Sequence, residues 1–171
     1  MVFMDQVVDP QNFGSIVRSS YYLGADCLLV NRDNKPPLSP SVSKISSGAI
    51  EKVHVFSVKH VKKFIQEAIN NDYKIISTIL NKTETLKTVN VNELQKKELL
   101  KKGDNCLLIL GSEESGVSEI ISSEFEKLSK NIINVKVPSY ITNPSTKELI
   151  DSINVGVSAG ILIKKINDII K

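Results

Sequence analysis

Cysteine and histidine are scarce in this sequence of 171 residues, which contains two of each. Cys27 and Cys106 both lie inside apolar runs, which argues against a disulfide framework and favours two buried thiols. His54 and His60 do not stand beside a suitable turn, so no Ser-His-Asp arrangement and no cluster of metal ligands can be read. We interpret both histidines as structural or surface residues.

Long apolar runs and glycine-rich phosphate loops are also missing. No apolar stretch reaches the ~18–20 residues that a membrane-spanning helix needs, and no signal peptide is visible. The 8 glycines form neither a G-x-G-x-x-G nor a G-x-x-x-x-G-K pattern, which disfavours a flavodoxin-like nucleotide binder. The sequence therefore predicts a protein that has no membrane partner.

The composition that remains is that of one ordinary globular domain. Hydrophobic residues make up 41% of the chain and charged residues 24%, as in typical soluble proteins. A formal net charge of +3 permits an RNA partner without requiring one. Because the chain enters an apolar run at its second residue, we expect residues 1–171 to be one domain of a longer chain, whose N-terminal domain and targeting segment are not included.

Short apolar runs alternate with amphipathic segments along the chain. The short runs predict strands over residues 2–8, 27–30, 53–56, 74–79, 106–110 and 132–137. Apolar residues at helical spacing predict helices over residues 14–22, 59–70, 117–128 and 148–170, a short helix over 46–50 and a helical segment over 94–102. Residues 31–47 are predicted to form a long connection. This alternation predicts an α/β fold with a mainly parallel sheet and helices on both faces.

Several predicted strand ends break sharply into small and polar residues, which is typical of loops that hold a ligand. Residues 110–116, LGSEESG, follow a buried strand and precede a helix. Two carboxylates at this turn disfavour a bound phosphate and suit a ligand with a cationic or hydrogen-bond-donating part. The same residues are equally compatible with an ordinary strand-to-helix turn that has an acidic helix start.

Polar residues near the two ends of the chain are further candidates. Asn12 and Arg18 lie six residues apart across a turn into a helix. An arginine on a helix is most often a solvated or ion-paired surface residue, but the polar turn beside Arg18 favours a functional role. Ser152 and Asn154 flank Ile153 at the start of an apolar helix, where Asn154 can also be a helix cap.

Together these segments resemble the three ordered motifs of the SpoU (TrmH-type) RNA ribose 2′-O-methyltransferases of the SPOUT class. Residues 9–18, DPQNFGSIVR, resemble the first motif, and residues 110–117, LGSEESGV, the second. Val137-Pro138 followed by residues 152–161, SINVGVSAGI, resembles the third. Residues 42–49, VSKISSGA, are similar to another segment common in the family. Among its subgroups, the chain looks most like the mitochondrial large-subunit rRNA ribose methyltransferases.

One segment departs from the family pattern. Residues 139–147, between Pro138 and Ser152, are longer than usual and lack the Met and Gly that usually follow the proline. Ile153 also stands where the family usually has Leu. The resemblance places the longer loop at the border of the cofactor, so the cofactor contacts of that loop do not carry over to this chain.

The resemblance implies a trefoil-knotted α/β fold, S-adenosylmethionine as the cofactor and a homodimer. A knot is not predicted by the strand pattern, because chain connections in general avoid knots. The implied backbone contacts to the cofactor are at Gly111, Val137 and Ile153, with Thr78, Leu110 and Ser112 beside them. The residues would form the catalytic domain of the longer chain.

The implied reaction is in-line attack of an RNA ribose 2′-hydroxyl on the sulfonium methyl group, where alignment supplies much of the catalysis. The implied catalytic residues are Arg18, Asn12, Glu113, Ser152 and Asn154. An arginine with a pKa above ~12 is almost never neutral at pH 7, so we expect Arg18 to grip the target phosphate as a cation. A substrate phosphate or water then takes the proton.

The substrate, partner and location follow from the subgroup that the chain resembles. The substrate and partner is large-subunit rRNA, methylated at a guanosine, and the location is mitochondrial. The alternatives are tRNA as the substrate and the cytoplasm as the location. A catalytically silent RNA-binding or ribosome-assembly protein on the same fold is the other alternative. Candidate RNA contacts are Lys35, Lys44 and the lysines of residues 87–102. The last helix carries many isoleucines, which predicts dimer packing, with burial in the core as the alternative: Ile161, Ile163, Ile166, Ile169 and Ile170.

Overall fold

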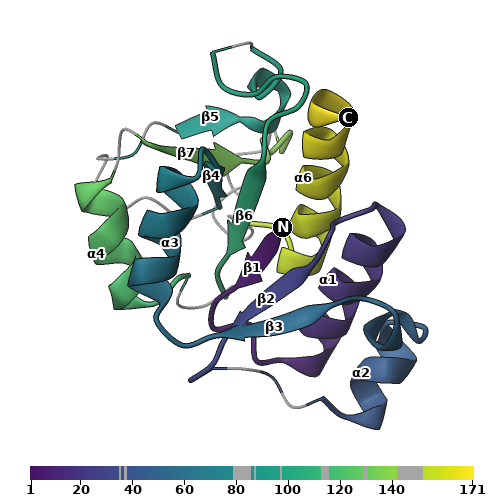
Figure 1. Cartoon of the computed structure of the whole chain (residues 1–171). Coiled ribbons are helices and arrows are strands. Elements are labelled where there is room, and N and C mark those ends of the chain that lie inside the picture. The colour runs from purple at the N-terminus through teal and green to yellow at the C-terminus, as the bar shows by residue number, and fades with distance from the viewer. Residues whose placement is uncertain are drawn as a thin grey trace.

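A computed structural model describes residues 1–34, 36, 38–78, 86, 88–96, 98–112, 116–128, 131–141 and 152–171. Its centre is a seven-stranded sheet in the order β3-β2-β1-β6-β4-β7-β5 (Figure 1), and every pairing in it is parallel. The strands are β1 (Val2–Met4), β2 (Leu28–Asn31), β3 (Val55–Val58), β4 (Lys74–Ser77), β5 (Thr88–Asn90), β6 (Cys106–Leu110) and β7 (Ile132–Lys136). The prediction of a parallel α/β sheet is confirmed.

Helices cover both faces of the sheet. On one side lie α1 (Pro10–Tyr22) and α6 (Val155–Ile170), with α2 (Pro40–Ile45) packed against α1, and on the other side lie α3 (Val61–Asn70) and α4 (Glu119–Lys127) (Figure 1). Two 3-10 turns, η1 (Ala49–Glu51) and η2 (Val91–Glu93), complete the described elements. Among the described residues, no helix is long and apolar enough to cross a membrane.

The strands divide the core into two clusters because successive side chains point to opposite faces. In β1, Val2 and Met4 pack with the α1/α6 side, whereas Phe3 packs with the α3/α4 side. All five residues of β6 are buried, as expected for a central strand of a parallel sheet. The continuous apolar run that predicted this strand thus reflects helices on both faces.

Helix α1 has clear start and stop signals. The Asp9 side chain caps it by accepting a hydrogen bond from the Asn12 amide at 2.9 Å, and Pro10 occupies the first turn, where proline costs no helical hydrogen bond. Past the other end, Gly24 has a φ of +76°, a conformation that favours glycine. The helix thus begins four residues before the predicted start.

Several predicted elements differ from the structure. The first strand ends at Met4 rather than at residue 8, because Gln6 turns the chain with a φ of 58°. The predicted long connection contains α2, which begins at Pro40 with Ser39 as its N-cap. The short strand β5 was not predicted. Cys106 is buried as predicted, whereas Cys27 is only half-buried.

The predicted helical segment over residues 94–102 is wrong for its described part, 94–96 and 98–102, which holds turns. Leu94, Leu99 and Leu100 are buried there, so apolar spacing was mistaken for helical period. The last helix, predicted over residues 148–170, is observed as α6 from Val155, and residues 148–151 of the prediction lie outside the described residues. Residues 142–151 lie outside the described residues, so the trefoil knot stays a prediction.

Candidate functional site

The carboxyl ends of all seven strands meet at one edge of the sheet, since the pairings are parallel. The turn after β6 folds tightly there: Ser112 and Gly116 exchange backbone hydrogen bonds of 2.7 and 3.1 Å. A Cβ on Gly111 would lie 2.5 Å from the Gly116 carbonyl oxygen and 2.7 Å from the Val117 nitrogen. Both neighbours are backbone atoms, so only glycine fits at this position.

Asp5 fixes both ends of this turn, and its role was not predicted from the sequence. The Asp5 amide donates to the Leu110 carbonyl at 2.9 Å, and its carboxylate accepts from the Ser118 amide at 2.6 Å. The other carboxylate oxygen accepts from the Asn31 side chain at 2.8 Å. Asp5 is fully buried, and charge-assisted bonds of this kind are the strong ones. A carboxylate just after an apolar run was the available signal.

Two of the predicted catalytic residues meet across 142 positions of sequence. The Asn154 amide nitrogen donates to the Asn12 side-chain oxygen at 2.7 Å. The Asn154 side-chain oxygen accepts from the amides of Gly156 and Val157, so Asn154 is the N-cap of α6. The helix-cap interpretation is confirmed, and this bond brings the segment around residue 12 to that around residue 154.

Close packing of α1 on α6 supports that junction. A Cβ on Gly156 would lie 2.7 Å from the Ser15 hydroxyl oxygen and 2.9 Å from the Ser15 Cβ, too close for any side chain. One turn further on, a Cβ on Gly160 would lie 3.7 Å from the Ser19 hydroxyl oxygen, which is an ordinary van der Waals contact. The small residues of the third motif therefore allow two helices to approach closely.

The other predicted catalytic residues are Arg18, Ser152 and Glu113. Arg18 is exposed on α1, and among the described residues it forms no ion pair with the other candidates. Ser152 is also exposed, and it has a hydrogen-bonding or electrostatic partner. Glu113 lies outside the described residues.

The predicted cofactor contacts lie at neighbouring strand ends. Gly111 and Ser112 follow β6, Val137 follows β7, and Thr78 follows β4, which lies between them in the sheet. All four are half-buried, Leu110 is fully buried, and Ile153 is exposed. These positions therefore share the carboxyl edge of three adjacent strands, β6, β4 and β7.

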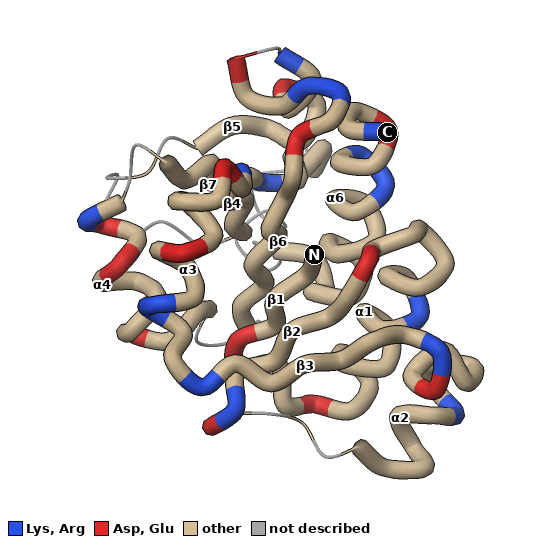
Figure 2. Tube along the Cα trace, viewed as in Figure 1, with Lys and Arg blue, Asp and Glu red and all other residues tan. Residues whose placement is uncertain are grey.

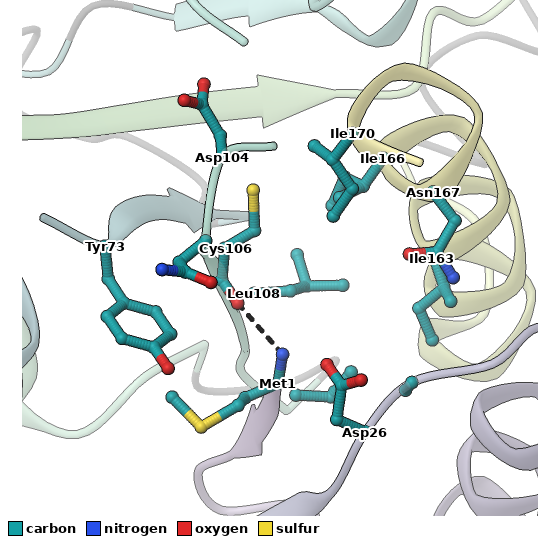
Figure 3. Close-up of a pocket in the computed structure, with 13 residues that line it drawn as sticks. Met1, Asp26, Tyr73, Asp104, Cys106, Leu108, Ile163, Ile166, Asn167 and Ile170 are labelled. Atoms are coloured by element: carbon teal, nitrogen blue, oxygen red, sulfur yellow. Dashed lines mark hydrogen bonds between the residues drawn. The ribbon is translucent and has the colours of Figure 1, made fainter. Parts of the chain in front are cut away.

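A separate small cavity lies at the opposite, amino edge of the sheet (Figure 3). It has a volume of about 80 Å³ and is lined by Cys106, Tyr73 and Asp104 among others. The Met1 amino group donates to the Cys106 carbonyl there at 2.9 Å. Burial raises the pKa of the Cys106 thiol to about 11, so the nucleophilic thiolate is scarce at pH 7. This cavity lacks an activated nucleophile.

The part of the chain that is described contains no candidate metal site. No three side chains of His, Cys, Asp or Glu come together there to hold an ion. His54 and His60 are both exposed, in agreement with their interpretation as surface or structural residues. The candidate site is therefore the carboxyl edge around the 111–116 turn and the Asn12–Asn154 bond.

Comparison with known proteins gives related chains over nearly the whole sequence. The mitochondrial rRNA methyltransferase 1 of Schizosaccharomyces pombe is 33% identical over 165 residues, which are 95% of this chain and 49% of that protein. The human protein of the same name is 32% identical over 164 residues, 95% of this chain and 44% of that protein. The chain thus spans about half the length of these curated relatives.

Solved structures share the fold. A TrmH/SpoU tRNA modifying enzyme from A. aeolicus superimposes with a TM-score of 0.73 at 24% identity, covering 98% of this chain and 73% of that one. An AdoMet-bound rRNA methyltransferase from Sinorhizobium meliloti gives a TM-score of 0.70 at 18% identity, covering 98% and 55%. A sequence model of the SpoU rRNA Methylase family matches residues 1–164, and with that extent of agreement the chain belongs to this family.

Proposed function

We propose that this chain is the catalytic domain of an S-adenosylmethionine-dependent RNA methyltransferase that acts on a ribose 2′-oxygen. The observation that carries the proposal is the 2.7 Å hydrogen bond between Asn154 and Asn12. It joins two segments that resemble the first and the third motif of the family.

The residues at the carboxyl edge suit the cofactor. Gly111 and Val137 follow strands separated by one strand, β4, so they lie about 10 Å apart, at two strand spacings. That separation leaves room for a flat heterocycle with hydrogen bonds on both of its edges. The polar backbone groups there also match an adenine, whose recognition needs both donors and acceptors. When bound, S-adenosylmethionine supplies the electrophilic methyl group.

The proposed roles of the side chains follow from their chemistry and placement. Arg18 is a permanent cation that binds the target phosphate and stabilises negative charge as it develops on the attacking oxygen. Asn12 and Glu113 orient Arg18 or the ribose. Ser152, exposed at the start of α6, contacts the nucleotide. A substrate phosphate or water receives the proton of the 2′-hydroxyl.

Asn154 has a more restricted role than the others. Its oxygen accepts two backbone hydrogen bonds and its nitrogen donates to Asn12. We therefore propose that Asn154 mainly holds the start of α6 and the Asn12 side chain in place for the nucleotide.

A guanosine of mitochondrial large-subunit rRNA is the proposed substrate. The names of the S. pombe and human relatives, both mitochondrial rRNA methyltransferases, support rRNA and a mitochondrial location. The A. aeolicus relative in fold is called a tRNA modifying enzyme, so tRNA is the second candidate. A ribosome-assembly role without catalysis is the remaining alternative.

A homodimer through α6 is also part of the proposal. Ile163 and Ile166 of α6 are buried in the core of this chain, but Val157 is 54% and Ile161 38% exposed. Val157 and Ile161 lie four residues apart and share one face of α6; Ile153, which is also exposed, precedes the N-cap Asn154. An unpartnered apolar stripe beside the candidate site is typical of an interface.

The cofactor can be tested directly by calorimetric titration of the protein with S-adenosylmethionine. We expect micromolar affinity for the wild type and for Arg18→Ala, because Arg18 contacts RNA and not the cofactor. Gly111→Ala removes binding, because its Cβ forces the 111–116 turn open. An absence of binding to the wild type would favour a catalytically silent protein.

A further inference from the structure

A second hollow lies on the α3 side of the carboxyl edge, away from α1 and α6. We name it the β3–α3 groove, and its volume is about 660 Å³. It is lined by Asn31, Asp33, residues 59–63, Gln66 and Ile120. The lining residues come from the ends of β2 and β3 and from the starts of α3 and α4, so the groove lies at the same sheet edge as the candidate methyl-transfer site.

Three lysines line this groove, and two of them are ion-paired with glutamates. Lys59, Lys62 and Lys63 line it, against one lining carboxylate, Asp33. Figure 2 shows Lys and Arg segments where β3 leads into α3 and just beyond the end of β2. Lys62 is bonded to Glu124 at 2.9 Å, and Lys63 forms a looser pair with Glu67 at 3.6 Å. Among the described residues, Lys59 forms no ion pair.

An exposed aromatic pair, His54 and Phe56, lies just before and on the edge strand β3. The His54 and Phe56 rings stack with centroids 6.4 Å apart and an interplanar angle of 25°. Phe56 is 55% exposed. Residues 54, 56 and 58 share one face of a strand, and Val58 packs on the α3/α4 side. The aromatic pair therefore projects on the same side as the groove.

We propose that the β3–α3 groove and the aromatic pair bind a single-stranded RNA segment that flanks the target nucleotide; this rests on the proposed function. Bases stack on Phe56, and Lys59 and Lys63 hold the phosphates. Aromatic faces interleaved with cations are the combination that binds single strands without reading their sequence. Because β3 is three strands from β6, the surface begins about 14 Å from the 111–116 turn, within reach of neighbouring nucleotides.

The test uses fluorescence anisotropy with a labelled oligoadenylate of about twelve nucleotides, long enough to cover a typical single-strand site. Loss of one stacking ring in Phe56→Ala is expected to weaken binding by about tenfold. Lys59→Gln is expected to reduce the slope of log affinity against log salt by about 0.7. The control is Lys74→Gln, which removes an exposed lysine at the amino end of β4 and should change neither quantity.

Polyglutamate is the competitor, since it carries negative charge but no bases. If it displaces the oligonucleotide as well as unlabelled RNA does, the aromatic pair has no role and the proposal is wrong. Wild-type affinity in both Phe56→Ala and Lys59→Gln would also overturn it, even if the protein methylates RNA. If both variants bind the oligonucleotide weakly but the wild type transfers no methyl group, the groove is an RNA-binding surface and the proposed function is wrong.

Discussion

The pairs of helices on the two faces of the sheet are held in contact by different interactions. On the α1/α6 side, small residues let two helices touch, and Gly156 leaves no room beside Ser15 for even one added carbon. On the α3/α4 side, the nearly buried Glu124 accepts bonds from Lys62 and Gln66 of α3, both at 2.9 Å. One face depends on shape, and the other depends on a charged side chain.

This difference matches what each face carries. The α1/α6 side presents Asn12, Asn154 and Arg18, whose relative positions would shift with any change in the helix contact. Short-range packing fixes such positions because it tolerates little displacement. The α3/α4 side covers the other face of the sheet and borders the β3–α3 groove. Flexible lysines are sufficient there, because contacts to RNA phosphates do not require exact positions. Perturbations of the first face should therefore alter activity, and those of the second should alter pH dependence or RNA affinity.

The largest effect is expected at Arg18. Arg18→Ala removes the cation that binds the phosphate, and we expect the rate of methyl transfer to fall by about 10³-fold, as when a transition-state donor is lost. Arg18→Lys should restore little of this rate, because lysine cannot form two parallel hydrogen bonds to the phosphate. Both variants should fold normally, since Arg18 is exposed. Near wild-type rates in Arg18→Lys would show that bidentate binding is not used.

The shape dependence of the α1/α6 side can be tested with two matched glycine substitutions. Gly156→Ala places a carbon 2.9 Å from the Ser15 Cβ, and we expect a loss of about 2 kcal/mol in unfolding free energy. In Gly160→Ala the new carbon would lie 3.7 Å from the Ser19 hydroxyl oxygen, without a clash. We expect the unfolding free energy to rise by up to about 1 kcal/mol because alanine has the higher helix propensity. Chemical denaturation measures both. Equal effects of the two substitutions would mean that the close contact does not matter.

The sequence predicted the sheet class because β6 is a short continuous apolar run and α3 has a clear helical period of apolar residues. It missed α2, in which only Val42 is buried, although Ser39-Pro40 is a recognisable helix start. It also missed β5, whose three residues have only Val89 buried. A segment with one buried side chain shows no periodicity.

The candidate site was predicted in part. The glycine turn and the Asn154 cap are local features, so their residues could be named from the sequence. The bonds from Asp5 to Ser118 and from Asn154 to Asn12 span 113 and 142 positions. Such pairs depend on strand order, which the pattern of one sequence does not contain. Family resemblance supplied Asn12, whereas the only signal for Asp5 was a carboxylate directly after an apolar run, which does not identify its partners.

The charge dependence of the α3/α4 side should appear as a pH effect. The hydrogen bond from Lys62 lowers the pKa of Glu124, assisted by Gln66 and Lys127 and opposed by burial. Glu124 therefore stabilises the fold above its unfolded pKa of about 4.3, and this contribution is lost as the pH falls through the lowered folded value. Glu124→Gln should lower the melting temperature by about 4 °C at pH 7.

The difference between Glu124→Gln and the wild type should shrink steadily below pH ~4, where the unfolded carboxyl is also protonated. Glu126→Gln, on the exposed side of the same helix, is the control and should leave the melting curve unchanged. A Glu124→Gln difference that stays constant from neutral to acid pH would mean that lost packing, and not lost charge, causes it.

The smallest effect is expected at Ser20 on the buried side of α1. Ser20 is fully buried, and within the described part of the chain its hydroxyl oxygen has no hydrogen-bond partner. Ser20→Ala removes an unsatisfied polar atom and improves helix propensity, so we expect a gain of up to about 1 kcal/mol in unfolding free energy. Urea titration would detect it. A clear loss would show that the hydroxyl is bonded in solution.

The most direct test of the account is transfer of a labelled methyl group from S-adenosylmethionine to RNA, followed by alkaline hydrolysis. A methyl on the ribose 2′-oxygen blocks cleavage of the adjacent phosphodiester bond, because the 2′-hydroxyl is the group that attacks it. We predict that the label appears in alkali-resistant dinucleotides and that Arg18→Ala eliminates it. Label in mononucleotides would place the methyl group on a base, and no label with any rRNA or tRNA would contradict the proposed activity.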